Sequence, residues 1–521
     1  MRSECLRGTR TDILRSIVDW KSNRFTERVL WLYGLAGSGK STIANTISNI
    51  FREHGCLGAF LFFNRDTEER SQPSNVIRTI AYQLASFCPR IGTAIAEAID
   101  GMPSIVLSPL RLQFTKLMAE PLSTLPLTEP PIVVVLDALD ECGNTEDRRD
   151  LLAILTTNVI NLHPSIRILI TSRAEFDIRA AFLTSPHTLA QQLDISSNHN
   201  FQDILIFLHV RMSEIRSANT SLRLPPDWPG ELSLKMLAQR AAGLFVWAAT
   251  ACRFIDGHDP RNRLDVLLRN SAIVGAESAL NTLYQTAVES AGLWDDGEFC
   301  ADFKVIMGTI LVAKKPLSAN AIDTLLSLQR PARHTILRLQ CVLTWSETEP
   351  IRILHPSFAD FISDHLRCGS FSWHINTSTH NRCFAIICLN YLGRVLRRNI
   401  CDLKLSFSSV NEVLSDAISY TCLSWMDHIF DITDSEGTEF IVDTLEQFLF
   451  QHLLHWLEVM SILNKSRTTV ASVHRLLNWL RVCDSYFILC WSKPIVVAAS
   501  TTSDETTRTC GGCITIRANI C

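Results

Sequence analysis

The segment that decides the fold of the first half of the chain is Val29-Leu-Trp-Leu-Tyr-Gly34-Leu-Ala-Gly-Ser-Gly39-Lys40-Ser41. Its apolar start predicts a buried strand, and the pattern G-x-x-x-x-G-K-[ST] follows at once. Residues 41–51 then predict a helix. A strand, a glycine-rich turn and a helix start together aim successive backbone N–H groups and the helix dipole at one anion. The segment therefore predicts a phosphate-binding loop.

Each residue type in this loop has a chemical reason to be there. The glycines let the backbone wrap phosphate groups without a Cβ in the way. Lys40 supplies a positive charge for β- and γ-phosphates, and the Ser41 hydroxyl is a ligand for Mg²⁺. The predicted nucleotide-binding residues are Gly34, Leu35, Ala36, Gly37, Ser38, Gly39, Lys40, Ser41 and Thr42.

A second element, Val133-Val-Val-Leu-Asp137-Ala-Leu-Asp140-Glu141, is an apolar strand that ends in acidic residues. Nucleotide-hydrolysing proteins with a phosphate loop present a carboxylate to the metal in this way. Asp137 is therefore predicted to bind the metal together with Ser41. Glu141, or alternatively Asp140, would orient or deprotonate the attacking water. Taken alone, the segment could equally be an exposed acidic patch, but the phosphate loop favours the metal site.

The next predicted strand ends in Ile168-Leu-Ile-Thr-Ser-Arg173, with a basic residue at the same edge of the sheet. In a parallel sheet, ligands bind at the carboxyl ends of the strands. Arg173 is therefore predicted to sense the γ-phosphate or to stabilise its transfer. An ordinary surface salt bridge is the alternative role for this arginine.

The order of these patterns predicts several domains. Strands at 29–33, 57–63, 132–136, 166–171 and 191–195 alternate with helices, among them one at 145–162, which predicts a parallel α/β sheet. After an N-terminal lead-in at 1–27, the nucleotide-binding domain is expected at 28–195 and a helical domain at 196–270. A winged-helix-like domain is expected at 271–375, because two helices precede a hairpin of 342–345 and 351–354. An all-helical domain at 376–490 and a disordered tail at 491–521 would complete the chain.

The composition argues against several classes of protein and of binding site. The 521 residues include 49 basic and 53 acidic ones, a net charge of −4, which does not favour a nucleic-acid binder. No run of about 18 apolar residues predicts a membrane span, and the N-terminus has no signal-peptide pattern, so a cytoplasmic protein is expected. The 17 cysteines are scattered, and Cys510-Gly-Gly-Cys513 lacks the second ligand pair of a zinc site.

Together, Gly34–Thr42, Val133–Glu141 and Ile168–Arg173 resemble the NACHT branch of the STAND nucleotide-switch ATPases, which include the NLR immune receptors. The resemblance is closest to the fungal NLR-like NACHT proteins, whose ATPase segment is also related to the nephrocystin type. It implies that ADP holds a closed monomer and that exchange for ATP opens the helical and winged-helix domains for self-oligomerisation. The implied role is signal transduction of an innate-immunity-like kind, with protein partners that the sequence does not identify. Weaker matches are Gly8-Thr-Arg10, Phe62–Asp66, Ala242–Ala248 and Leu354–Phe358.

The resemblance also gives His355 a role, since it lies where relatives have a winged-helix histidine that touches the ADP β-phosphate. A histidine at a helix start is also an ordinary cap, and both interpretations stay open. Gly243-Leu-Phe-Val246 lacks the proline that relatives often place against the base, so GTP stays an alternative to ATP. Neither the effector domain nor the sensor repeats of relatives are expected in this chain.

The expected function is thus a weak, Mg²⁺-dependent ATPase that acts as a signalling switch. One rival is a protein-interaction scaffold whose ATPase is vestigial. Another is a turnover enzyme, such as a kinase or motor NTPase with a phosphate loop. A winged helix could instead bind DNA through Arg330, Arg333 and Arg338, but no wider basic patch supports this.

Overall fold

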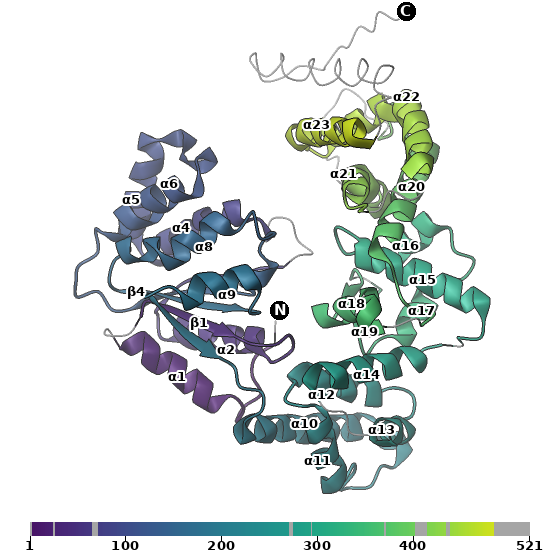
Figure 1. Ribbon diagram of the computed structural model, residues 1–521, viewed down its shortest axis with the longest axis horizontal. Coiled ribbons are helices and arrows are strands. Elements are labelled where there is room, and N and C mark those ends of the chain that lie inside the picture. Colours follow the sequence, from purple (N-terminus) through teal and green to yellow (C-terminus); the bar gives the residue numbers. More distant parts are fainter. Residues whose placement is uncertain are drawn as a thin grey trace, which may run out of the picture. The chain divides into compact units, whose positions relative to one another are not determined.

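A computed structural model of the chain describes residues 3–23, 27–64, 71–269, 275–292, 294–347, 349–368, 371–401, 414–433 and 438–483. They fall into two compact units (Figure 1). Unit 1 consists of Met1–Gly292, Arg338–Thr344 and Ile353–Phe371. Unit 2 consists of Leu293–Leu337, Trp345–Arg352 and Ser372–Cys521.

The core of unit 1 is a sheet of five parallel strands in the order β2-β3-β4-β1-β5. Strands β1, β3 and β4 are almost completely buried, as expected for continuous apolar runs covered on both faces. This confirms the predicted α/β fold. The strands are β1 (Val29–Tyr33), β2 (Leu57–Phe62), β3 (Ile132–Asp137), β4 (Ile166–Ser172) and β5 (Thr188–Gln192).

Alternate residues of the central strands enter two different cores, because successive side chains of a strand point to opposite faces. Leu30 and Leu32 pack with α1 (Thr11–Ser22) and α2 (Lys40–Glu53). Val29 and Trp31 pack with residues of the helices on the other face. Figure 1 shows α1 and α2 on one side of the sheet and α8 and α9 on the other. The second face is covered by α4 (Val76–Phe87), α5 (Pro89–Gly101), α6 (Leu110–Phe114), α7 (Glu120–Leu122), α8 (Arg149–Thr156) and α9 (Phe176–Leu183).

The remaining elements are mostly helical, in agreement with the predicted helical second half. Unit 1 continues with α10 (Asn198–Ala218), α11 (Glu231–Arg240), α12 (Phe245–Ile255), α13 (Pro260–Arg269), α14 (Ala276–Glu289), α18 (Pro356–Ser363) and α19 (His365–Cys368). Unit 2 holds α15 (Gly297–Val312), α16 (Ala319–Leu326), α20 (Thr377–Val395), α21 (Asp416–Phe430), α22 (Thr438–Ile462) and α23 (Ser466–Cys483). Between α16 and α18 lie α17 (Arg333–Arg338) and a two-stranded sheet of β6 (Leu343–Thr344) and β7 (Arg352–Ile353), at the positions of the predicted hairpin.

Two local expectations need correction. The helix predicted at 145–162 is shorter and spans Arg149–Thr156. It begins late because the Asn144 side chain accepts hydrogen bonds from the N–H groups of Glu146 and Asp147, at 2.8 and 2.9 Å, and holds a turn before it. The last strand lies at Thr188–Gln192 rather than 191–195, since its partly exposed edge position leaves only a weak apolar signal. The N-terminal lead-in contains the helix α1, which helps to cover the sheet.

Among the described residues, no helix has both the length and the apolar character needed to cross a membrane. The predicted tail at 491–521, with Cys510 and Cys513, lies outside the described residues.

Unit 2 contains a buried polar network around His428. The Tyr420 hydroxyl accepts a hydrogen bond from the Lys314 N–H at 3.1 Å and donates its own proton to His428 Nε2 at 2.8 Å. The other ring nitrogen, Nδ1, donates to Asn381 Oδ1 at 2.8 Å. Both ring nitrogens are thus satisfied in the neutral form. Burial, with a smaller contribution from the charge of Lys314, lowers the pKa of His428 well below its ordinary value.

This network predicts an acid-sensitive unit 2. The unfolded chain binds a proton at this histidine near pH 6.5 while the folded chain does not, so the stability is present above that pH and is lost as pH falls. We expect His428 to account for a loss of up to about 2 kcal/mol in the free energy of unfolding between pH 7 and pH 5, a limit reached when the folded chain binds no proton at this histidine.

Urea denaturation of the full chain at both pH values measures this loss. His428→Gln should be less stable at pH 7 and lose less on acidification, whereas the exposed His334→Gln should behave as wild type. An equal loss in wild type and His428→Gln would contradict the assignment.

Candidate nucleotide-binding site

Three motifs of the sequence meet at one edge of the sheet. Strand β4 lies between β3 and β1, and all three run parallel. The carboxyl end of β1 leads into the glycine-rich loop, β3 ends at Asp137, and β4 ends next to Arg173. The strand order alone therefore brings the predicted phosphate loop, the acidic residues and the basic residue together, as is usual for ligand sites in such sheets.

The loop is held in a conformation that requires glycine. Gly37 and Gly39 have φ angles of 75° and 97°, in the left-handed region. A Cβ at Gly37 would lie 2.0 Å from a methyl group of Val246 on α12. The Val246 N–H donates a hydrogen bond to the Gly37 carbonyl at 3.0 Å. The start of α12 thus packs directly against the phosphate loop.

Lys40, the first residue of α2, is buried and turned back onto the loop. Its Nζ donates to the carbonyl oxygens of Gly34 and Leu35 at 2.9 and 2.8 Å. The pKa of Lys40 is lowered to about 8, mainly by burial. The charge of Arg173 lowers this pKa further, whereas the charges of Asp140 and Glu141 raise it. Ser41 and Thr42 follow in the first turn of α2 and are half-buried.

Asp137 is completely buried at the end of β3. Its Oδ1 accepts a hydrogen bond from the Thr171 hydroxyl at 2.6 Å, and that hydroxyl accepts one from the Ala138 N–H at 3.1 Å. Ala138 has a φ of 62°, in the left-handed region that is unfavourable for a residue with a Cβ. The local backbone is therefore bent sharply behind a carboxylate of fixed orientation.

The oxygen donors at this edge suit Mg²⁺. The described residues contain no group of three or more His, Cys, Asp or Glu side chains that could hold a metal ion unaided. Mg²⁺ in nucleotide sites usually binds one or two protein oxygens, phosphate oxygens and water. The Ser41 hydroxyl and the Asp137 carboxylate fit this pattern, in which the ion arrives with the nucleotide.

Asp140 and Arg173 are joined at two points. Asp140 Oδ1 accepts a hydrogen bond from the backbone N–H of Arg173 at 3.0 Å, and its Oδ2 lies 3.4 Å from the guanidinium Nε. Of the two acidic residues predicted to activate water, Asp140 is thus buried and engaged with Arg173. Glu141 is half-buried at the end of the short helical turn Leu139–Glu141.

Arg148, at the start of α8, is a site residue that the sequence did not indicate. Its buried guanidinium pairs with Glu175 and, at 2.6 Å, with Asp177 in the segment after β4. It also donates to the carbonyl of Asp140 at 3.2 Å. Burial opposes its charge, but the two carboxylates outweigh this effect and raise the pKa of Arg148. Arg148 therefore ties the turn after β3 to the loop that carries Arg173.

Arg10 braces the phosphate loop from the N-terminal side. Its Nη2 donates to the Ser38 carbonyl at 2.6 Å, and its guanidinium carbon lies 4.7 Å from the ring centre of Phe245. The Arg10 N–H donates to Asp203 of α10 at 3.0 Å. The sequence linked Gly8-Thr-Arg10 to the family resemblance but assigned this arginine no role. Its contacts connect the loop to both α10 and α12.

His355 caps α18 in this structure. Its Nδ1 accepts a hydrogen bond from the Ser357 N–H at 3.2 Å and lies 2.7 Å from the Ser357 hydroxyl oxygen. Its predicted contact with the ADP β-phosphate stays a prediction. Farther along the same helix, Asp360 reaches the site, with its Oδ2 2.9 Å from Nη1 of Arg173. The sequence gives no indication of a role for Asp360, because nothing in a helical sequence marks a partner 187 residues away.

One family model matches the part of the chain that carries these motifs. Residues 8–173 match the family model described as "Nephrocystin 3, N-terminal". No curated protein sequence matches the chain. Among solved structures, a STAND protein with a tetratricopeptide repeat sensor from Pyrococcus horikoshii is 12% identical over 98% of this chain and 60% of its own, with a TM-score of 0.43. This chain thus spans about 60% of the length of that protein.

Two further solved structures are looser matches. Cdc6p from Pyrobaculum aerophilum is 11% identical, with 68% of this chain and 92% of that chain covered and a TM-score of 0.31. The Drosophila ORC structure, bound to DNA, is 12% identical, with 69% of this chain and 87% of that chain covered and a TM-score of 0.30. Residues 8–173 thus combine a match to the nephrocystin-type family model with a phosphate loop at the edge of a parallel sheet, the arrangement of a nucleotide-binding segment.

Proposed function

We propose that this chain is a nucleotide-controlled switch that binds ADP and ATP with Mg²⁺ and hydrolyses ATP slowly. The observation that carries the proposal is the convergence of Lys40, Asp137 and Glu141 at one edge of the sheet. In the proposed site Lys40 leaves the two loop carbonyls and binds the β- and γ-phosphates. Ser41 and Asp137 hold the ion, which would neutralise phosphate charge when bound.

Hydrolysis in this proposal uses the residues at the ends of β3 and β4. Glu141 orients a water molecule and accepts its proton as the water oxygen bonds to the γ-phosphorus. The bond from that phosphorus to the ADP oxygen breaks, and inorganic phosphate leaves. Arg173 neutralises charge on the transferred group. His355 is proposed to report the nucleotide state to the segment around α18.

A switch also needs a path from the nucleotide to the helical region, and two contacts supply one. Val246 of α12 is hydrogen-bonded to Gly37, and Arg10 connects Ser38 to α10 and α12. A change of the loop on nucleotide exchange would therefore strain these contacts. We propose that the resulting opening exposes surfaces for self-association and for protein partners, in the cytoplasm.

DNA binding receives little support from the three arginines considered above. Arg330 pairs with Glu298 at 3.0 Å, and Arg338 donates to the carbonyl of Ala291 at 3.2 Å. Two of the three are thus engaged within their own units.

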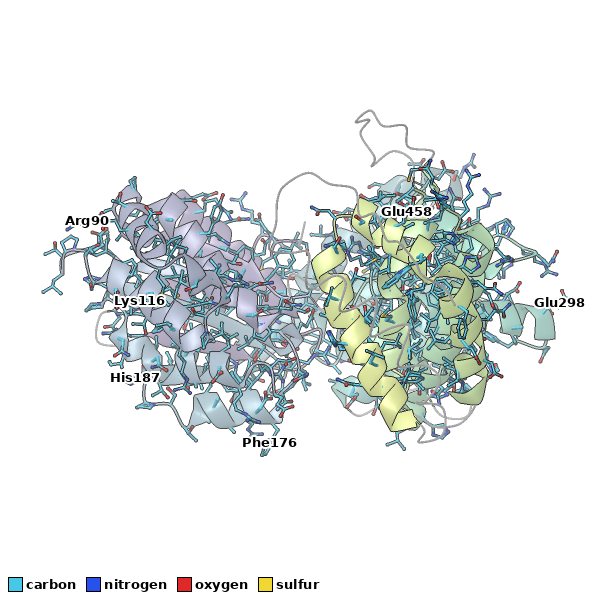
Figure 2. All side chains as sticks on the ribbon, turned by 90° about the horizontal axis from the view of Figure 1, so that it is seen from above. Arg90, Lys116, Phe176, His187, Glu298 and Glu458 are labelled. Atoms are coloured by element: carbon cyan, nitrogen blue, oxygen red, sulfur yellow. The ribbon has the colours of Figure 1, made fainter. Side chains whose placement is uncertain are left out.

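The first prediction concerns the nucleotide that purifies with the protein. Because Lys40 is the cation of the loop, wild type should carry about one ADP per chain and Lys40→Ala should carry none. Chromatography of the supernatant after denaturation identifies the nucleotide, including its base. Lys116→Ala, at a surface lysine labelled in Figure 2, is the control and should retain ADP.

The other outcomes of that experiment separate the rival functions. A stable wild-type protein without nucleotide, which also fails to bind added ADP or ATP, would sink the proposal in favour of a scaffold with a vestigial site. Turnover of about 1 s⁻¹ or faster would instead support a turnover enzyme.

The second prediction follows from the lowered pKa of Lys40. Phosphate should raise this pKa again, so ADP binding takes up a proton wherever the free amine is deprotonated. With a pKa of about 8 in the free protein, we expect uptake of about 0.7 proton at pH 8.5 and about 0.1 at pH 7.

Calorimetry in buffers of different ionisation enthalpy measures this uptake directly. The affinity for ADP should fall as pH rises above 8 for the same reason. Binding without proton uptake at pH 8.5 would show that Lys40 does not contact the phosphates.

A further inference from the structure

Arg173 is held between two carboxylates from different parts of unit 1. Asp140 binds its backbone N–H and lies beside Nε, whereas Asp360 binds Nη1 at 2.9 Å. The side chain of Asp140 is 4% exposed, and that of Asp360 is 36% exposed. Burial opposes the charge of Arg173, but Asp360, ahead of Asp140 and Glu141, outweighs it and raises the pKa of Arg173. Asp360 is thus the strongest partner of this guanidinium.

The helix that carries Asp360 is firmly fixed on α14. The hydroxyl oxygens of Ser357 and Tyr284 lie 2.7 Å apart, and both side chains are buried. The Phe358 and Phe361 rings pack on Tyr284, with centroid distances of 5.2 and 5.7 Å. Asp360 therefore cannot follow Arg173 far unless α18 leaves α14.

A carboxylate and a phosphate compete for the same N–H groups of an arginine. In the proposed function Arg173 faces the γ-phosphate. While α18 is docked, a triphosphate must either draw Arg173 away from Asp360 or place its γ-phosphate near that carboxylate, which repels it. A diphosphate meets neither obstacle, because it has no group to bind at Arg173.

We propose that Asp360 is a specificity-determining residue, which occupies Arg173 and makes the nucleotide site of this conformation select ADP over ATP. The inference rests on the proposed function of the Lys40 site. It assigns the discrimination between diphosphate and triphosphate to an ion pair between Arg173, which follows β4, and Asp360 of α18. By linkage, a bound triphosphate must favour release of α18 to the same extent.

The test compares Asp360→Asn with wild type. The variant keeps the shape of the side chain but removes the charge that competes with phosphate. Dissociation constants are measured by calorimetry for ADP and for a non-hydrolysable ATP analogue, both with Mg²⁺. We expect ADP affinity to stay within about twofold and the affinity for the ATP analogue to rise about tenfold, the scale of one charge-assisted hydrogen bond.

Asp364→Asn is the matched control, since it removes the same charge just after α18, where an asparagine can still accept the hydrogen bond from the Leu366 N–H. It should leave the ratio of the two affinities unchanged. The ADP affinity of each variant reports whether the site is intact. If Asp360→Asn loses ADP binding, Asp360→Ser is measured in its place.

An unchanged ratio in a variant that still binds ADP would overturn the inference, and so would an equal change for both ligands. Failure of the proposed function has a different signature. In that case wild type would bind neither ADP nor the ATP analogue, or Lys40→Ala would bind both as well as wild type does.

Discussion

The parallel alignment of β3, β4 and β1 is the constraint on which the rest of the structure depends. Because β4 lies in the middle, the ends of the three strands form one short edge that collects the phosphate loop, Asp137 and Arg173. The two apolar cores keep this register, since a shift by one residue would exchange their side chains between the faces. The site is thus a consequence of how the apolar strands pack.

The charges at this edge are neutralised by neighbours that bound nucleotide could replace. Lys40 is buried on two carbonyl oxygens, and Arg173 is bound to Asp140 and Asp360. Burial is costly for the charged form of Lys40 even with Asp140 and Glu141 nearby, so an anion at the loop would stabilise that charge. The pair of Arg173 and Asp360 would be weakened by the same event, which connects nucleotide binding to α18.

The sequence could predict the parts of the site that depend on local patterns. Strands β1 to β4 follow from their apolar runs, whereas β5 lies three residues before its predicted position. The phosphate loop, the acidic end of β3 and the basic residue after β4 follow from short local motifs. The break before Arg149 depends on one asparagine turn, and the roles of Arg148 and Asp360 depend on contacts 27 to 187 residues away. Such tertiary contacts have no signature in a single sequence. His355 illustrates the difference, because its position at a helix start could be recognised in the sequence, whereas its hydrogen-bond partner could not.

The most direct test of the central claim is an experimental structure of the full chain with ADP and Mg²⁺. The account predicts phosphates on the backbone N–H groups of Gly37–Ser41, with Lys40 moved from the Gly34 and Leu35 carbonyls onto the β-phosphate. The pair of Arg173 and Asp360 should remain intact in that complex. Nucleotide bound elsewhere, or Lys40 still on the loop carbonyls beside a bound nucleotide, would contradict the account.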